Sequence, residues 1–172
     1  MLLGGGMDFF ARRPDGRDLL GEMRERYTVV TTPAEFEQLD LARTERLLGL
    51  FADSTIYPDA QQRPPMTDMA RAALEIVDRD PDGFFLLLES EDTDDLGHDN
   101  VPIDSLIDGM RALDAMIAVA LEYQVRHPET LIVVTGDHET GGLALRIDRG
   151  GGLTGTYVTG GDSAVMVLVF AG

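Results

Sequence analysis

Two stretches of the sequence combine carboxylates with an imidazole in patterns that suit metal binding. The first is Glu89-x4-Asp94-x3-His98, and the second is the adjacent pair Asp137-His138. Divalent ions such as zinc and magnesium take carboxylate oxygen, and zinc also imidazole nitrogen, as ligands at about 2 Å. Cysteine is absent from the chain, so any metal must use oxygen and imidazole donors. Together the two stretches predict a two-metal site, which could clamp the attacking and leaving oxygens of a phosphoryl transfer.

Each stretch also has a plainer interpretation, which the residues alone leave open. In a chain with 31 acidic residues, the first stretch could be a solvated acidic loop. Asp137 and His138 could be a helix cap and a surface histidine. We assign the remaining histidine, His127, to the end of a helix, because it precedes a proline and an imidazolium is favoured there by the helix dipole.

Both stretches follow apolar runs. Residues 84–88 and 131–134 show no polar alternation, the pattern of strands that are covered on both faces. The carboxyl ends of parallel strands lie at one edge of a sheet, where α/β proteins place their sites. We therefore expect the two stretches to meet at such an edge. Gly97 would let the first stretch bend inward, and residues 140–142 would turn the second one back.

The rest of the chain alternates strands and helices. We expect strands at 1–3, 27–31, 47–52, 143–147 and 164–170, the last of them buried. We expect helices at 18–26, after the capping box that starts at Thr32, from a cap at Thr67 to 78, and at 102–125, where a Met and Leu stripe predicts a core face. Residues 53–65 and the glycine-rich 150–161 are expected to be loops. This alternation predicts a single α/β domain over 1–172, in three α/β/α layers with a mostly parallel and incomplete central sheet.

The composition excludes several classes of protein. The net charge is −17, and all 14 basic residues are Arg, so the surface would repel nucleic acid and anionic membranes. The acidity suits either a halophilic protein, whose self-repulsion is screened by salt, or a chain from a high-GC genome. We expect no transmembrane helix, because no apolar run approaches 20 residues. The first residues lack the regions of a signal peptide, and the absence of cysteine leaves the compartment open.

At these residues the sequence resembles the alkaline phosphatase family. The resemblance is carried by Glu89-x4-Asp94-x3-His98 and by residues 130–142, which include Asp137-His138-Glu139-Thr140-Gly141-Gly142, and it extends over nearly the whole chain. It implies an alkaline phosphatase-like fold and phosphomonoester hydrolysis with two zinc ions and one magnesium ion. By this resemblance Glu89 is a magnesium ligand, Asp94 and His98 bind the first zinc, and Asp137 and His138 bind the second. The second motif argues against a related phosphodiesterase or mutase.

The sequence also departs from the family pattern. The resemblance places the nucleophilic serine, the phosphate-clamping arginine and further ligands before the Gly4-Gly5-Gly6 stretch, so we expect this chain to be a C-terminal portion with no catalytic residue of its own. Asp162 occupies the place of a histidine ligand of the first zinc and could bind through oxygen. Asp95 stands where a bulkier residue is usual, and it adds negative charge. Ser163 follows Asp162 as in the nucleophile motif, but its strand-like surroundings argue against that role.

Several expectations follow from the resemblance. The chain alone would show weak or no turnover of a phosphomonoester, and the alternative is an inactive, truncated or degenerate metal-binding homologue. Its ligands would be a phosphomonoester or inorganic phosphate. Full-length family members are expected in the periplasm or outside the cell. An incomplete sheet would expose an edge or an apolar patch, which predicts a homodimer or association through that edge.

Overall fold

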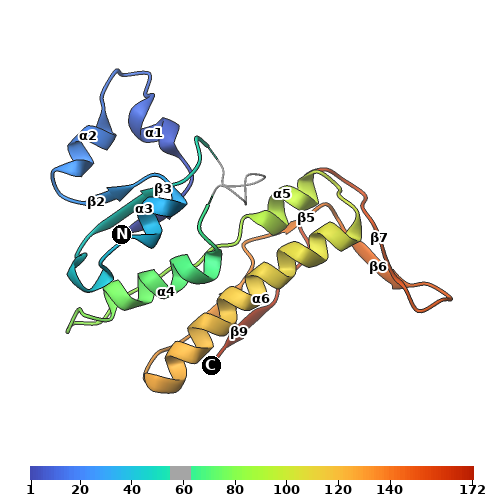
Figure 1. Cartoon of the computed structure of the whole chain (residues 1–172). Helices are drawn as coiled ribbons and strands as arrows, with labels where there is room; N and C mark the ends of the chain where they lie inside the picture. The colour runs from blue at the N-terminus through green and yellow to red at the C-terminus, as the bar shows by residue number, and fades with distance from the viewer. Residues whose placement is uncertain (55–62) are drawn as a thin grey trace. The chain divides into compact units, whose positions relative to one another are not determined.

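The chain divides into two compact units, Met1–Leu88 and Glu89–Gly172 (Figure 1). The computed structural model describes residues 1–54 and 63–172, so most of the loop expected at 53–65 lies outside the described residues. The first unit contains a parallel sheet and the larger buried core. The second contains all five predicted metal ligands. That residues 1–172 form a single domain stays a prediction.

A three-stranded parallel sheet organises the first unit. Its order is β1 (Leu2–Gly4), β3 (Leu47–Leu50), β2 (Thr28–Val30), so β3 lies in the middle. Leu48 pairs with Leu2 on one side and with Val29 on the other. All four residues of β3 are buried, as expected for a central strand in a parallel sheet. The strands expected at 1–3, 27–31 and 47–52 are therefore confirmed.

Helices surround this sheet. They are α1 (Met7–Ala11), α2 (Leu19–Arg24), α3 (Pro33–Glu37), the 3-10 helix η1 (Leu41–Arg43) and α4 (Met66–Val77). The capping box at the start of α3 is confirmed, since Thr32 Oγ1 accepts from the Glu35 amide and the Glu35 carboxylate accepts from the Thr32 amide. The cap predicted at Thr67 is wrong. Pro65 is the N-cap of α4, and no side chain caps that helix.

The core of the first unit joins α3, α4 and the sheet. Phe36 of α3 lies edge-on to Phe51, with ring centroids 5.9 Å apart. Ala72 and Ile76 of α4 pack in the same cluster as Val30 and Leu47. Arg79, just after α4, donates to the carbonyls of Leu41 and Thr44, which ties the end of the helix to η1.

The second unit contains two helices and six short strands. The helices are α5 (Asp92–His98) and α6 (Ile103–Arg126), and the strands are β4 (Val133–Thr135), β5 (Glu139–Thr140), β6 (Ala144–Ile147), β7 (Leu153–Thr156), β8 (Asp162–Ser163) and β9 (Val169–Ala171). The strands form antiparallel pairs, β4 with β9, β5 with β8 and β6 with β7. The long helix α6 and the β6–β7 hairpin are clear in Figure 1.

Helix α6 confirms the predicted element and, in part, its predicted core face, since six of the eight residues of the stripe are partly buried. Pro102 precedes the helix and His127 is its C-cap, where the imidazole stacks on Tyr123. The fully buried positions are Gly109, Met116, Val119 and Tyr123, whereas Met110 and Leu121 of the predicted stripe are about half exposed. Periodicity located the helix, but the close packing of α5 at Gly109 selects which side faces inward.

Two strand predictions and one loop prediction need correction. Residues 84–88 form no strand, because they pair with no other described strand, and Phe85 and Leu87 are exposed. The predicted strand at 164–170 is reduced to β9, and its apolar side chains are exposed rather than buried. The loop predicted at 150–161 contains β7, which pairs with β6 in a hairpin. For the two predicted strands the apolar run was present, but the partner that decides pairing and burial was not visible in the sequence.

The α/β class is confirmed, with β1, β3 and β2 supplying the parallel sheet. The two site motifs do not follow two parallel strands. Only β4 precedes a motif, and it pairs antiparallel with β9. No helix among the described residues is both long enough and apolar enough to cross a membrane.

The starts of α3 and α4 differ in side-chain capping, and this difference can be tested by mutation. We expect Thr32→Ala to lower the free energy of unfolding by about 1 kcal/mol, because the α3 amide that Thr32 holds loses its acceptor. Thr67→Ala is the matched control and should cause no loss, since Thr67 makes no cap hydrogen bond. Urea unfolding followed by circular dichroism measures both. Equal losses of unfolding free energy in the two variants would contradict a capping role that Thr32 has and Thr67 lacks.

Candidate metal centre

Helix α5 brings the first two ligands together. The motif predicted a bent loop here, but residues 92–98 form a helix. Asp94 and His98 are four residues apart, and this spacing places both side chains on the same helical face. Asp94 Oδ2 lies 3.4 Å from His98 Nε2. The four-residue spacing of Asp94 and His98 is therefore typical of a helix, and the prediction of a loop was wrong.

The ladder between β5 and β8 supplies the opposite side of the site. In its register Thr140 lies opposite Asp162, and Glu139 lies opposite Ser163. Residues that pair in an antiparallel ladder project to the same face, and their neighbours project to the other. Thr140 and Asp162 therefore share the site face. Ser163 lies on the other face and donates to Glu139, which also accepts from the amides that follow it.

Glycines allow α5 to approach this ladder closely. A Cβ at Gly97 would lie 3.1 Å from Thr140 Cβ and 3.2 Å from Thr140 Cγ2. Gly97 thus serves close packing inside a helix rather than the bend that the sequence suggested. Gly141 and Gly142 have φ of +88° and +58°, which glycine adopts at little cost, so the chain can turn directly after Thr140.

Asp94, His98 and Asp162 form the first donor group. His98 Nδ1 lies 2.8 Å from the Gly160 carbonyl oxygen, and because a carbonyl only accepts, Nδ1 carries the proton. The lone pair is then on Nε2, which lies 3.4 Å from Asp94 Oδ2 and 3.5 Å from Asp162 Oδ1. A backbone acceptor on the far nitrogen is the usual way in which a protein orients a metal-binding histidine.

These separations fit donors around a common ion. Two donors that each lie about 2.1 Å from one ion in a tetrahedral arrangement are about 3.4 Å apart. A charge-assisted hydrogen bond would bring the same atoms to about 2.8 Å. The Nε2–oxygen distances of 3.4 and 3.5 Å therefore match shared coordination better than direct hydrogen bonding. The separations from His98 Nε2 fit a divalent ion that this nitrogen shares with an oxygen of Asp94 or of Asp162.

Asp137 and His138 form the second donor group. Thr140 Oγ1 donates its proton to Asp94 Oδ1, so it can only accept from His138 Nδ1, 3.1 Å away. The free lone pair of His138 is therefore on Nε2, which lies 3.5 Å from Asp137 Oδ2. The other oxygen of Asp137 accepts from the His138 amide at 3.0 Å. This group offers two donors, fewer than the three or four of a zinc site.

The two groups adjoin one another. Ligand atoms of Asp94, His138 and Asp162 all lie within 4.8 Å of one another, which alone would suggest a single three-residue site. His138 Nδ1 lies 3.5 Å from Asp162 and 3.9 Å from Asp94, but this nitrogen holds the proton that it shares with Thr140. The hydrogen bonds thus favour two neighbouring sites over one.

The structure brings four of the five predicted residues together and leaves one aside. Asp94, His98, Asp137 and His138 meet, whereas Glu89 is exposed and no hydrogen bond or ion pair of the described residues links it to them. Sequence reasoning gave Thr140 only a turning role and missed its two hydrogen bonds. Its place two residues after His138 was the available signal, since an extended backbone returns to the same face after two residues.

The charges around the site favour a bound cation. The hydrogen bond to the Gly160 carbonyl raises the pKa of His98, and the carboxylates of Asp94 and Asp162 raise it further. Partial burial and then the neighbouring carboxylates raise the pKa of Glu91 and of Asp95 above the ordinary range. A carboxyl oxygen of Asp95 is buried without a hydrogen-bond partner among the described residues. This concentration of negative charge lowers the cost of binding a divalent ion.

Comparison with known proteins identifies the family. The family model of alkaline phosphatase matches residues 1–168. The chain therefore belongs to the alkaline phosphatase family, whose members are phosphomonoesterases. The structure of the alkaline phosphatase from the Antarctic bacterium TAB5 matches with a TM-score of 0.82 and 27% identity, over 98% of this chain and 52% of that one. A TAB5 variant with Mg bound in the M3 site matches with a TM-score of 0.84 and 28% identity, over the same shares of the two chains.

Curated relatives agree with this family. Alkaline phosphatase 3 of Bacillus subtilis is 30% identical over 154 residues, which cover 86% of this chain and 32% of that protein. Streptomycin-6-phosphate phosphatase of Streptomyces griseus is 32% identical over an alignment 206 residues long, which covers 98% of this chain and 45% of that protein. The chain thus spans less than half the length of these two relatives.

Proposed function

We propose that this chain carries part of the two-metal site of a phosphomonoester hydrolase. Asp94, His98 and Asp162 would hold the first ion, and Asp137 and His138 would hold the second. The observation that carries the proposal is the pair of distances from His98 Nε2, 3.4 Å to Asp94 and 3.5 Å to Asp162, because they suit donors of one ion. Membership of a phosphomonoesterase family supports the reaction class. The substrate would be a phosphomonoester, with inorganic phosphate as product.

The residues of the chain would act by holding and orienting. Two divalent ions would supply positive charge to the attacking and leaving oxygens of phosphoryl transfer. Asp94 and Asp162 add negative charge to the first group, and the proton on His98 Nδ1 keeps its Nε2 aimed at them. The second group has two donors, so we infer that it requires further donors besides Asp137 and His138.

We propose zinc for both groups and magnesium for Glu89, with a specific departure at Asp162. A carboxylate in place of an imidazole makes the first group richer in oxygen, and harder ions favour oxygen donors. Asp162→His should therefore raise the affinity of the chain for zinc by about tenfold or more. Glu89→Gln should weaken magnesium binding and leave zinc binding unchanged. Isothermal titration of each variant with zinc and with magnesium measures these effects. Zinc affinity that is equal in the wild type, Asp162→His and Asp162→Ala would exclude Asp162 as a ligand.

We expect this chain by itself to hydrolyse a chromogenic phosphomonoester weakly or not at all. The two hydroxyl groups on the β5–β8 ladder are both committed to carboxylates, Thr140 to Asp94 and Ser163 to Glu139, so neither is free to attack phosphorus. Any turnover should require added metal and should fall at least tenfold in Asp137→Ala. The measurement is release of p-nitrophenol with zinc and magnesium, at low and high salt, with EDTA as the blank. Metal-independent turnover would contradict the proposal.

The second candidate is an inactive metal-binding homologue. It is favoured by Asp162 at the place where the family resemblance expects a histidine, and by the commitment of both ladder hydroxyls. The two candidates differ in one combined result. Because the chain alone is expected to show weak or no turnover in either case, the deciding test joins it to the N-terminal part of a related alkaline phosphatase. Tight zinc binding without turnover of that longer polypeptide would support the inactive homologue, whereas metal-dependent turnover that Asp137→Ala removes would support the hydrolase.

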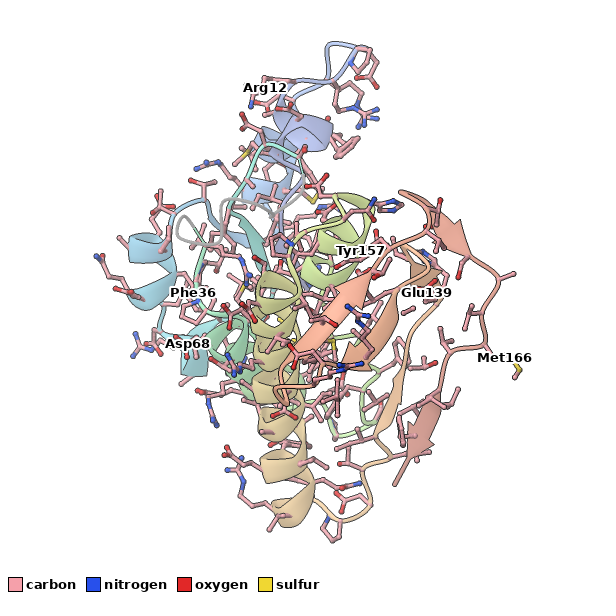
Figure 2. The ribbon with its side chains drawn as sticks, turned by 90° about the vertical axis from the view of Figure 1, so that its right-hand side faces the viewer. Arg12, Phe36, Asp68, Glu139, Tyr157 and Met166 are labelled. Atoms are coloured by element: carbon pink, nitrogen blue, oxygen red, sulfur yellow. The ribbon has the colours of Figure 1, made fainter. Side chains whose placement is uncertain are left out.

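We also propose that two copies of the chain associate through the exposed apolar segment before and along β9. Val165, Met166, Leu168 and Phe170 are exposed, and the side chain of Met166 points away from the ribbon (Figure 2). Strand β9 pairs only with β4 among the described strands, so its other edge offers free backbone groups to a second copy.

Light scattering tests this association. We expect a dimer at micromolar concentration and a shift toward monomer in the double variant Met166→Ser with Leu168→Ser, because it removes apolar surface outside the β4–β9 pairing. Met110→Ser, a half-exposed position on α6, is the control and should leave the mass unchanged. A monodisperse monomer in the wild type would overturn the proposal.

A further inference from the structure

We propose that Thr140 is a positioning residue that couples the two metal-binding groups through its single hydroxyl. The inference rests on the proposed function, because it concerns the same two groups. It assigns to Thr140 a role that the sequence motif did not reveal. One oxygen atom would hold a ligand of the first ion and a ligand of the second at the same time.

The hydrogen-bond geometry defines this role. Thr140 Oγ1 donates to Asp94 Oδ1 and lies 3.1 Å from His138 Nδ1. An ionised carboxylate can only accept, so the hydroxyl proton points to Asp94, and His138 must donate to the hydroxyl oxygen. A hydroxyl has only one proton, so the direction of one bond sets the direction of the other. The tautomer of His138 is thus tied to the hydrogen bond that Thr140 donates to Asp94.

Each bond leaves the metal-facing atom of its partner free. Thr140 occupies Oδ1 of Asp94, and Oδ2 faces His98 Nε2 at 3.4 Å. Thr140 also occupies Nδ1 of His138, so the lone pair on Nε2 faces Asp137 at 3.5 Å. Partners that hold the outer atom of a metal ligand fix its tautomer and orientation, and their loss typically costs 10–100-fold in metal affinity.

The packing around Thr140 explains why this residue suits the position. Its Cβ and Cγ2 lie against Gly97 of α5, where an added Cβ would come within 3.2 Å of both. Its backbone pairs with Asp162 in the β5–β8 ladder. A β-branched side chain has few χ1 rotamers, so the contact of the methyl group with α5 helps to aim the hydroxyl at Asp94. Serine would keep the hydroxyl but lose this contact, and valine would keep the shape but lose both hydrogen bonds.

The coupling predicts a distinctive pattern of metal binding. We expect Thr140→Val to weaken zinc binding at both groups by about 10–100-fold, although Thr140 itself binds no ion. Thr140→Ser should retain affinity within about threefold of the wild type. Thr156→Val on β7, an exposed threonine of the same unit, is the matched control and should leave both affinities unchanged. Isothermal titration with zinc gives the stoichiometry and affinity, and circular dichroism checks that each variant is folded.

A second measurement needs no metal. Nitrogen-15 NMR of the histidine side chains should show the metal-free wild type with the proton of His138 on Nδ1. Thr140→Val should lose that preference, while His98, which donates to Gly160, should keep its own. An unchanged His138 tautomer in Thr140→Val would overturn the inference. If the wild type binds no zinc, the proposed function fails, and the NMR result still decides whether Thr140 orders the two groups.

Discussion

The site depends on one short antiparallel ladder, the two-residue pairing of β5 with β8. It places Thr140 and Asp162 on one face and Glu139 and Ser163 on the other. A shift of the register by one residue would reverse these faces, because side chains alternate along a strand. Asp162 would then leave the site and Ser163 would enter it. The hydrogen bond that Ser163 donates to Glu139 across the ladder opposes such a shift.

Close packing against α5 completes the site. The ladder can only bring Thr140 to Asp94 because Gly97 has no side chain. The second glycine contact, Gly109 of α6 against Leu96 of α5, holds the other side of the same helix. Helix α5 therefore lies between β5 and α6. Each of the two contacts is made at a glycine, Gly97 against Thr140 and Gly109 against Leu96. Its pair of candidate ligands, Asp94 and His98, lies on one face of the helix and is positioned by this packing rather than by a flexible loop.

The negative charge of the site and that of the whole chain both favour the binding of a cation. A net charge of −17 and a helix that begins with several carboxylates produce repulsion that a divalent ion would relieve. Partial burial raises the pKa values of Glu91 and Asp95, and the repulsion from neighbouring carboxylates raises them further. Asp162 adds a further carboxylate beside His98. The chemical identity of the ion follows from the donor atoms, so an aspartate at this position shifts the first group toward oxygen ligands.

The sequence by itself determined the family, the α/β class and the residue types of the site. Local signals sufficed for these: the capping box at Thr32, the helix after Pro102, and the ligands in Glu89-x4-Asp94-x3-His98 and Asp137-His138. Only the tertiary structure decided the antiparallel β5–β8 register, the exposure of β9, the two hydrogen bonds of Thr140 and the grouping of Asp94 with His98, Asp137 and His138. The physical reason is that spacing along a chain records local geometry, whereas strand pairing, burial and the direction of a shared proton depend on partners distant in sequence.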